Sequence, residues 1–477
     1  MRQIGWILIA ALVLVMPLSV ANAQQPGAEI AVSCDRADAD VVREFNRIGT
    51  EVYQGALALF ATEASEDFTG DVGAVFAVSS RLQTELLGER FEDLINTCTE
   101  ARDAVRALGT VVTLAYNQTL NPYLAPGGLL STLPALPDTA SVLTVGQGVG
   151  VRSGFWDVYF NQPTGSGDRT TYVNGIDVPL AQAIAAAQNT LDIAAFEFNN
   201  AVLTEAVIDA HERGVTVRVV TDDEHGVEDE ESILDFEDAG IPIVDDDRSA
   251  LMHNKFMNID DAVVWTGSWN YTVNGTYRND NNALVMRSLG AVAAYQAEFN
   301  EMFERGEFGP RSEVGATSFI EDETPVRVLF AAEDEVVEAI NGEIAAAQDS
   351  VRFMAFSFTQ DDIGAAMRAA ADRGVEVSGV FELRGSETRF SEMPAMFCAG
   401  LDVRQDGSRY VLHHKVIIVD DATVLTGSFN FSANATESND ENLVILRDET
   451  LASLFLAEYE RVQDMAAPPP AEDIDCE

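Results

Sequence analysis

The sequence predicts an α/β protein built from two tandem copies of one α/β sandwich, each with a mixed sheet, behind a mainly helical N-terminal domain. Three observations predict this fold. Identical residues recur at a constant separation of 160 positions, short apolar runs alternate with helical stretches inside each copy, and residues 35 to about 112, ahead of the first copy, have helical spacing. We expect the two copies to face each other around a pseudo-two-fold axis, as in a symmetric dimer.

Residues 1–23 are typical of a targeting segment that is not part of the fold. Arg2 precedes the apolar run 6–16, and the segment ends with Ala-Asn-Ala at 21–23. A charged start, a short apolar core and an A-x-A end indicate a cleavable signal peptide. We therefore expect a secreted or periplasmic protein that is cleaved near Ala23, with a retained membrane anchor as the alternative.

The remaining chain divides by composition and spacing. Helical periodicity predicts a helical domain, a proline-containing stretch with looser spacing predicts a linker, and the proline-rich, acidic end predicts a tail. The expected boundaries are 24–120 for the helical domain, 121–150 for the linker, 151–310 and 320–465 for the two repeats, and 466–477 for the tail.

The charge composition argues against a polyanionic partner. Twenty-nine basic residues stand against 78 acidic ones, which gives a formal net charge of −49. A surface of this average charge repels nucleic acid, so a nucleic-acid partner is disfavoured unless a local basic groove forms. A phospholipid reached peripherally at a membrane surface fits the composition better, and the internal duplication predicts a monomer.

The four cysteines fit an exported protein. The pairing of Cys34 with Cys98 and of Cys398 with Cys476 is one of three possible pairings, and an oxidising compartment permits it. Because the chain has no CxxC or Cys/His cluster, its sequence argues against a structural zinc site.

Lysine is rare in this chain, and its positions are informative. Only Lys255 and Lys415 are lysines among the 29 basic residues, and three of the five histidines lie within two residues of them. These histidines are His253, His413 and His414. The abundance of arginine explains why lysine is rare, but it does not explain why the last two lysines lie beside histidines.

The duplication brings a set of polar residues into the chain twice. From about residue 184 to 286 the two copies align without net insertion. His253 and Lys255 recur as His413 and Lys415. The other polar pairs are Asp260/Asp420, Ser268/Ser428 and Asn270/Asn430.

Such a doubled set suits phosphodiester cleavage. In a single copy, the pattern would be explained equally well by a strand with one solvated face. Two copies around a pseudo-two-fold axis would place two imidazoles, two ammonium groups and two amides in one site. One histidine can then attack phosphorus while the other protonates the leaving oxygen. The lysines and asparagines can bind the non-bridging oxygens in the transition state.

The pattern His-x-Lys-x4-Asp followed by Gly-Ser-x-Asn, present twice, resembles the phospholipase D superfamily over about residues 180–450. The resemblance implies a two-layer α/β fold, no metal or other cofactor, and a phosphohistidine intermediate. It implies His253 as nucleophile and His413 as general acid. The residues counted as catalytic are His253, His413, Lys255, Lys415, Asp260 and Asp420, of which the two aspartates are expected to shape the motif. The residues expected at the substrate phosphate are Asn270, Asn430, Ser268 and Ser428.

One position departs from the family pattern. The family places a carboxylate about 28 residues after each histidine, where it fixes the tautomer and favours the imidazolium. Glu441 fits this role for His413, whereas the equivalent residue for His253 is Asn281. We expect that either His253 is more often neutral, which suits a nucleophile, or Asp280 substitutes for the missing carboxylate.

The remaining candidates have simpler interpretations. His414 is expected to be structural, because it alternates with the two motif residues beside it. The aromatic residues between 155 and 160 favour core packing over a lipid-facing rim, and Trp265 and Trp269 are expected to form walls of the pocket. The acidic run 222–231 favours a solvated loop over a Ca²⁺ site. His211 and His225 are expected to face solvent.

Three functions from different classes remain open at this point. The first is a secreted phospholipase D-like hydrolase that frees the head group of a phosphatidylcholine-type lipid and leaves phosphatidate. The second is an extracellular, metal-independent nuclease of the same superfamily. The third is a non-enzymatic surface interaction module, which only Asn281 favours, since both His/Lys pairs are retained.

Overall fold

The computed structural model describes residues 30–124, with gaps at 35–36, 62–73, 75–76, 79 and 88–89. It also describes residues 136–470, with gaps at 138–139, 146, 164, 170–171, 173 and 229–230, and residues 474 and 476. The predicted signal peptide and parts of the predicted linker and tail therefore lie outside the described residues. The chain divides into two compact units, 1–131 and 132–477. Among the described helices, none is both long and apolar enough to span a bilayer.

The first unit is helical, as predicted. Its long helices α3 and α6 bury their apolar faces together with the rings of Phe45 and Phe91, which meet edge to face at 5.6 Å. A disulfide joins Cys34 to Cys98, with Cα atoms 6.1 Å apart. The described elements are α3 (Ala39–Ala61), the π-helix η2 (Leu82–Leu86), α5 (Glu92–Thr97) and α6 (Thr99–Leu124).

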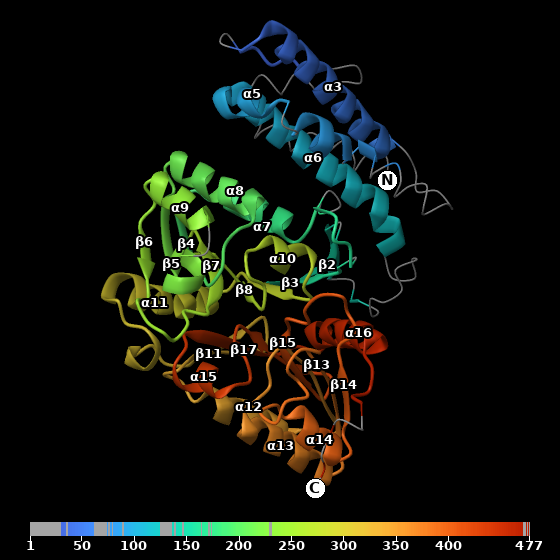
Figure 1. Cartoon of the computed structure of the whole chain (residues 1–477), viewed down its shortest axis with the longest axis vertical. Helices are drawn as coiled ribbons and strands as arrows, with labels where there is room; N and C mark the ends of the chain where they lie inside the picture. Colours follow the sequence, from blue (N-terminus) through green and yellow to red (C-terminus); the bar gives the residue numbers. More distant parts are fainter. Residues whose placement is uncertain are drawn as a thin grey trace. The chain divides into compact units, whose positions relative to one another are not determined.

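The second unit contains two mixed sheets (Figure 1). The first has the order β1-β2-β3-β9-β8-β7-β4-β5-β6, and the second has the order β10-β11-β17-β16-β15-β12-β13-β14. In each sheet the last three strands are parallel and the others antiparallel. The strands are β1 (Ser141–Val145), β2 (Gly148–Ser153), β3 (Trp156–Asn161), β4 (Thr190–Ala195), β5 (Thr216–Thr221), β6 (Ile243–Asp245), β7 (Lys255–Ile259), β8 (Val263–Gly267), β9 (Asn282–Met286), β10 (Thr317–Glu321), β11 (Thr324–Ala331), β12 (Ser350–Ala355), β13 (Glu376–Phe381), β14 (Asp402–Gln405), β15 (Lys415–Val419), β16 (Thr423–Gly427) and β17 (Glu441–Arg447).

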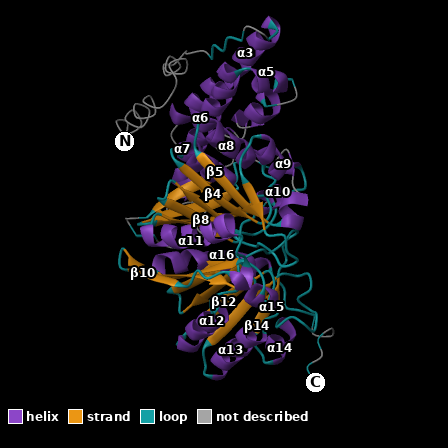
Figure 2. Cartoon of the chain, turned by 90° about the vertical axis from the view of Figure 1, so that its left-hand side faces the viewer, coloured by secondary structure: helices purple, strands orange, loops and turns teal. Residues whose placement is uncertain are grey.

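Helices cover both faces of each sheet, which produces five layers (Figure 2). Helices α11 and α16 lie between the two sheets and share one continuous core with both, while two further cores lie beneath the outer helices. The central strands are buried on both faces, so they are apolar runs without alternation. The helices are α7 (Asp177–Ala186), α8 (Ala201–Glu212), η4 (Asp223–Glu228), α9 (Glu231–Asp238), α10 (Val273–Tyr277), α11 (Leu289–Arg305), η5 (Gly309–Arg311), α12 (Val336–Ala346), α13 (Asp361–Asp372), α14 (Met393–Cys398), α15 (Ala433–Glu437) and α16 (Glu449–Met465).

The structure keeps the separation of 160 residues between equivalent elements from α7 and α12 onward. It relates β4 to β12, β7 to β15 and α11 to α16 without a shift. Helix ends follow local chemistry in both copies. The side chain of Asn200 caps α8 by accepting hydrogen bonds from the next turn, and Gln360 does the same for α13. The duplicated α/β fold predicted from the sequence is therefore confirmed.

The first repeat begins earlier than predicted. Strands β1 and β2 form an antiparallel hairpin that begins inside the range 121–150, which the sequence indicated as linker, and ends at Ser153. The glycines of β2 explain the error, because a strand containing Gly148 and Gly150 resembles a loop in sequence. Gly150 has a packing reason, since a Cβ there would lie 2.6 Å from the ring of Tyr159 on β3.

The aromatic residues before the first motif belong to the core, as predicted. Trp156 is 1% exposed, and its indole nitrogen donates a hydrogen bond to Asp448 of the second repeat at 3.0 Å. The prediction for the two later tryptophans is wrong. Trp265 stacks on Tyr159 at 5.4 Å, and Trp269 packs in the core beneath the outer helices, so neither forms a wall of the site.

The second disulfide fastens the end of the chain to the second repeat. Cys398, the last residue of α14, pairs with Cys476 across a Cα separation of 5.5 Å. The end of the chain also adds a short antiparallel bridge between Gln405 and Ala467. Both pairings match the arrangement that an oxidising compartment permits.

Candidate active site

A backbone segment of each repeat forms hydrogen bonds with the other repeat, directly beside the motif histidine of that other repeat. The amide of His253 donates to the carbonyl of Asp440 at 3.0 Å, and the amide of His413 donates to the carbonyl of Asp280 at 2.9 Å. Short parallel bridges form at both places. The two motifs therefore meet at one boundary, as the pseudo-two-fold arrangement predicts.

Side chains repeat this exchange. The hydroxyl of Thr266 donates to Oδ1 of Asn442 at 2.9 Å, and the hydroxyl of Thr426 donates to Oδ1 of Asn282 at 3.0 Å. All four residues are buried. The same contact made in both directions is the property of an isologous interface, here within one chain.

The orienting groups of the two histidines are exchanged between the repeats. Nδ1 of His253 lies 2.7 Å from Oε2 of Glu441, so the carboxylate predicted to serve His413 serves His253 instead. Asn281, predicted as the partner of His253, contacts His413. The correction follows from the backbone exchange, because residues 280–282 run beside the histidine of the opposite repeat.

His413 has an amide where His253 has a carboxylate. Its Nδ1 lies 2.9 Å from Oδ1 of Asn281 and 3.0 Å from the carbonyl oxygen of Ser268. Both are acceptors, so Nδ1 carries the proton and Nε2 is left for the site. Asp280 does not substitute for the missing carboxylate, because its side chain is paired with Arg461.

The two motif serines support the orienting groups. Ser268 donates its hydroxyl proton to Oδ1 of Asn281 at 2.9 Å and accepts the amide of Asn282 at 3.0 Å. Ser428 accepts the amide of Asn442 at 2.9 Å and hydrogen-bonds to Glu441. Both serines have zero exposure. Their hydroxyls are engaged behind the imidazoles in these contacts, so binding of the substrate phosphate by either serine stays a prediction.

Both motif lysines are held by their own loop and by an aromatic ring. Nζ of Lys255 donates to the carbonyl of His253 at 2.6 Å and lies 4.9 Å from the ring centroid of Phe196. Lys415 makes the same contacts in the second repeat, at 2.8 Å from the carbonyl of His413 and 4.7 Å from the ring of Phe356. Each ammonium group keeps unused donor capacity for an anion.

The motif asparagines have capacity for a ligand. Asn270 donates to Glu197 at 2.7 Å, while its Oδ1 is buried without a partner among the described residues. Oδ1 of Asn430 is likewise buried without a partner among the described residues. A buried amide group with an unused polar atom is costly unless a ligand or water satisfies it, so these two residues remain candidates for contact with substrate.

The electrostatics of the site favour an anion. Burial, strengthened by repulsion from both lysines, lowers the pKa of His253 and of His413 well below the usual value. Burial also lowers the pKa of Lys255 to about 8 and raises that of Glu441 to about 8. A bound phosphodiester anion would offset the repulsion and raise the pKa of the imidazoles, which couples substrate binding to proton uptake.

Sequence reasoning missed three residues near the histidines. Phe196 and Phe356 contact His253 and His413, with ring centroids 4.7 and 4.8 Å apart. Their recurrence at the constant separation was a signal that could have identified them. Glu197 gave no such signal, because residue 357 of the second repeat is a serine.

Two further histidine predictions have different outcomes. His414 is structural, as predicted, with zero exposure, Nε2 at 3.0 Å from Glu458 and Nδ1 at 3.0 Å from Asn282. His225, predicted to face solvent, is only partly exposed. It is half-buried, and its ring lies 4.8 Å from that of Phe196.

The acidic run after β5 begins in the interior. Asp222 is buried and accepts the amides of His225 and Met252, so the prediction of a solvated loop is wrong for this residue. Asp222, Asp223 and Asp246 offer carboxylate oxygens within 4.8 Å of one another. Buried Asp246 is protonated readily, because burial and the charge of Asp222 raise its pKa to about 7.

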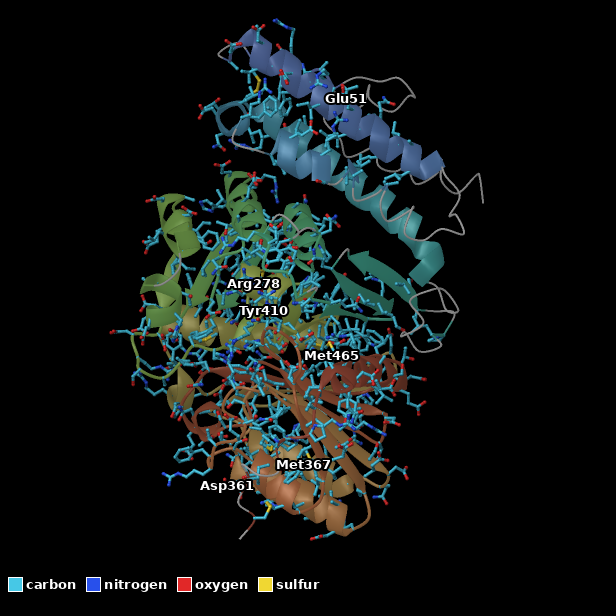
Figure 3. The ribbon with its side chains drawn as sticks, turned by 45° about the vertical axis from the view of Figure 1, so that its right-hand side comes forward. Glu51, Arg278, Asp361, Met367, Tyr410 and Met465 are labelled. Carbon is cyan, nitrogen blue, oxygen red and sulfur yellow. A yellow bond between two sulfur atoms is a disulfide. The ribbon has the colours of Figure 1, made fainter. Side chains whose placement is uncertain are left out.

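A stack of guanidinium and phenol groups, which includes Arg278 and Tyr410 (labelled in Figure 3), bridges the repeats near residue 280. Arg278 lies 5.4 Å from the ring of Tyr172 and 5.2 Å from that of Tyr410, and it donates to the hydroxyl of Tyr172 at 2.6 Å. Arg409 continues the stack at 5.5 Å from Tyr410. Because Arg278 is two residues from Asp280, the stack supports the segment that pairs with His413.

Asp260 and Asp420 are not part of the site. Each follows the far end of its strand and accepts hydrogen bonds from three backbone amides at the start of β4 or β12. Five strand residues separate Asp260 from the site end of β7, a distance of about 17 Å. These contacts hold the motif in shape, which is the role that the resemblance implied for the two aspartates.

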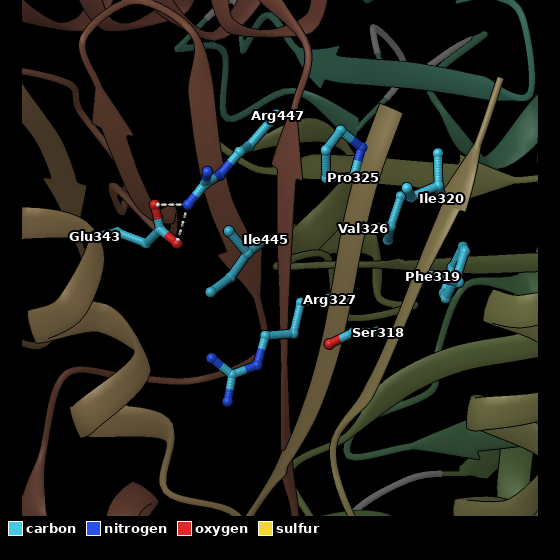
Figure 4. A pocket seen from close by; sticks show the side chains of 9 residues that line it. All are labelled: Ser318, Phe319, Ile320, Pro325, Val326, Arg327, Glu343, Ile445 and Arg447. Carbon is cyan, nitrogen blue, oxygen red and sulfur yellow. Dashed lines mark hydrogen bonds and ion pairs between the residues drawn. The ribbon is translucent and has the colours of Figure 1, made fainter. Parts of the chain in front are cut away.

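A pocket on the second repeat lies apart from the histidines (Figure 4). It has a volume of about 440 Å³ and is lined by β10, β11 and β17, with the Arg447–Glu343 ion pair at its rim. None of the predicted site residues lines it. It is therefore not part of the shared histidine–lysine site.

The fold and the site together define a class: duplicated α/β proteins in which two histidine–lysine pairs share one anion site. A family model described as "Cardiolipin synthase, PLD-like domain" matches residues 180–303 and 340–463, together just over half of the chain. The chain belongs to this phospholipase D-like family.

The chain is also similar to individual known proteins. The chain is 38% identical over 126 residues to the mitochondrial cardiolipin hydrolase of Xenopus tropicalis, covering 26% of this chain and 59% of that protein. It is 34% identical over 120 residues to a phospholipase D of Rickettsia conorii, covering 25% and 60%. The chain thus spans about three-fifths of the length of these relatives. A solved phospholipase D family member, NUC from Salmonella typhimurium, is 36% identical, with a TM-score of 0.29 and coverage of 30% and 97%.

Replacing Asp420 tests its structural role. Asp420→Ala removes the acceptor of three backbone amides, so we expect the free energy of unfolding to fall by about 1–3 kcal/mol. Denaturant unfolding measures this loss. The rate of diester cleavage per folded molecule should not change, and a large fall in that rate in fully folded protein would contradict the assignment.

Replacing Asn281 tests the exchanged orientation. In Asn281→Asp, a negative charge beside Nδ1 of His413 favours the imidazolium, so we expect the pKa of His413 to rise. A general acid must be protonated, so the alkaline limb of the pH–kcat profile should move to higher pH. An unmoved limb in a folded variant would show that His413 is not the acid. The substitution also removes the hydrogen bond that Nδ2 of Asn281 donates to the carbonyl of Gly275. Thermal unfolding is therefore the control for a loss of stability.

Proposed function

We propose that the protein is an exported phosphodiesterase that hydrolyses a phospholipid head-group ester, of the phosphatidylcholine type, to phosphatidate through a phosphohistidine. The observation that carries the proposal is the exchange of orienting groups. Glu441 reaches His253 and Asn281 reaches His413 across the boundary of the repeats, so both imidazoles belong to one site.

The unequal partners assign the two roles. Once ionised, the carboxylate of Glu441 beside Nδ1 raises the basicity of Nε2 and stabilises the cationic ring of a phosphohistidine, so His253 suits the nucleophile. An amide partner gives no such charge stabilisation, so the protonated form of His413 is the stronger acid. This agrees with the roles implied by the family resemblance.

The reaction then proceeds in two displacements. Nε2 of His253 attacks phosphorus while His413 donates its proton to the leaving head-group oxygen. Water enters on the side that the head group has left, His413 takes its proton, and the phosphorus–nitrogen bond breaks. The ammonium groups of Lys255 and Lys415, with Asn270 and Asn430, stabilise the charge on the non-bridging oxygens.

Charge and relatives support a lipid substrate. The formal net charge of −49 opposes the approach of nucleic acid. The relatives are named for cardiolipin hydrolysis and phospholipase D. The signal-peptide pattern at residues 1–23 and the two disulfides support export to an oxidising compartment.

The substrate class is tested with purified protein in EDTA. We expect release of free choline from phosphatidylcholine vesicles, or of the corresponding head group from cardiolipin vesicles, and no nicking of plasmid DNA. His253→Ala and His413→Ala should each abolish the activity, since general acid–base help alone contributes about 10²–10⁴-fold. Plasmid nicking without lipid cleavage would favour the nuclease, and absence of both would favour an interaction module.

The roles of the histidines are tested with a 4-nitrophenyl phosphodiester, because nitrophenolate leaves without being protonated. In His413→Asn the first displacement should proceed and the second should stall, which gives one burst of nitrophenol and an adduct on His253 detectable by mass spectrometry. His253→Asn should give neither. An adduct on His413 in that second variant would reverse the assigned roles.

A further inference from the structure

The loop between β13 and α14 carries exposed apolar and basic side chains. Leu383 is 49% exposed and Phe390 is 67% exposed. Arg384 and Arg389 are also exposed, and the guanidinium of Arg389 lies 4.7 Å from the ring centroid of Phe390. Single exposed apolar residues need no explanation, but two in eight residues, accompanied by arginines, indicate a contact surface.

The loop holds these side chains outward by its own hydrogen bonds. Gly385 adopts a left-handed conformation with φ of 83°, and the hydroxyl of Thr388 donates to its carbonyl at 2.8 Å. Buried Ser386 donates to the carbonyl of Leu383 at 3.1 Å and accepts from Gln405 at 2.9 Å. The exposure of the two apolar side chains is therefore built into an ordered turn.

The loop begins and ends beside the active site. The carboxylate of Glu382 accepts the amide of Leu412, the residue before His413, at 2.8 Å. At the other end, the amide of Glu392 donates to the carbonyl of Phe358 at 2.9 Å. Phe356, which contacts His413, is 36% exposed and adds a third apolar side chain to this edge of the sheet.

The first repeat differs at the same place. The residues equivalent to Leu383 and Arg384 are Asp223 and Glu224, so the shared scaffold does not require this apolar, basic composition. Residues 383–390 contain two arginines and one glutamate in a chain with a formal net charge of −49. A locally basic, apolar tip on an acidic protein is complementary to a surface that combines negative charge with hydrocarbon.

We propose that residues 383–390 dock the protein on an anionic phospholipid bilayer, with Leu383 and Phe390 entering the interface and Arg384 and Arg389 contacting lipid phosphates. The inference rests on the proposed function, because such a surface would present the substrate. It adds a binding surface outside the catalytic residues. Leucine and the absence of further aromatic residues in the loop favour lipid over stacked bases.

The test separates binding from catalysis. Leu383→Ser/Phe390→Ser is compared with wild type and with Leu289→Ser/Ile320→Ser, whose apolar residues are 77% and 73% exposed at the start of α11 and on β10. Flotation with phosphatidylcholine vesicles containing phosphatidylglycerol should show binding about 10–100-fold weaker for the loop variant only. Hydrolysis of soluble bis(4-nitrophenyl) phosphate should be equal in all three proteins.

Charge reversal provides a second measurement. Arg384→Glu/Arg389→Glu should weaken binding to anionic vesicles at least about fivefold per arginine, and should change binding to neutral vesicles much less. Undiminished flotation of the loop variants would overturn the proposal, as would displacement of wild type from vesicles by an oligonucleotide bound to the loop. Failure of wild type to cleave any diester would overturn the proposed function and leave the flotation result valid.

Discussion

The rest of the structure depends on one constraint, the exchange of backbone and side-chain contacts between the two repeats. Residues 280–282 of the first repeat contact residues 412–414 of the second, and residues 440–442 of the second make the equivalent contacts to residues 252–254 of the first. It positions both imidazoles, buries the polar residues that orient them, and fixes how the two sheets close over α11 and α16. Because Glu441 orients His253 and Asn281 orients His413 across the boundary of the repeats, neither histidine is oriented by its own half alone.

Within this symmetric frame the two halves are chemically unequal. His253 has a buried carboxylate as its partner and His413 has an amide, while the loops at the rim are acidic in the first repeat and apolar and basic in the second. The backbone supplies equivalent positions, and side-chain identity then divides the tasks. Side-chain identity distinguishes the nucleophile His253 from the acid His413, and it distinguishes the loop proposed to dock on lipid from its equivalent in the first repeat.

Much of the fold follows from the sequence, because a constant separation of 160 residues survives in the equivalent elements from α7 and α12 onward and apolar runs mark buried strands. The histidines and lysines were found for the same reason. The destination of Glu441 was not predictable, since spacing along the chain does not reveal that the start of its strand lies across the boundary, beside His253 of the other repeat. The buried roles of Ser268 and Ser428 follow from that same crossing, and Gly148 and Gly150 concealed a strand.

The different partners of His253 and His413 have a genetic consequence. In a homodimer of a single repeat, one codon would set the group beside both imidazoles, so a change from acid to amide would alter both at once. Joining two copies in one reading frame gives each imidazole a codon of its own. The fused chain can thus encode Glu441 as the partner of one imidazole and Asn281 as the partner of the other, which a homodimer cannot.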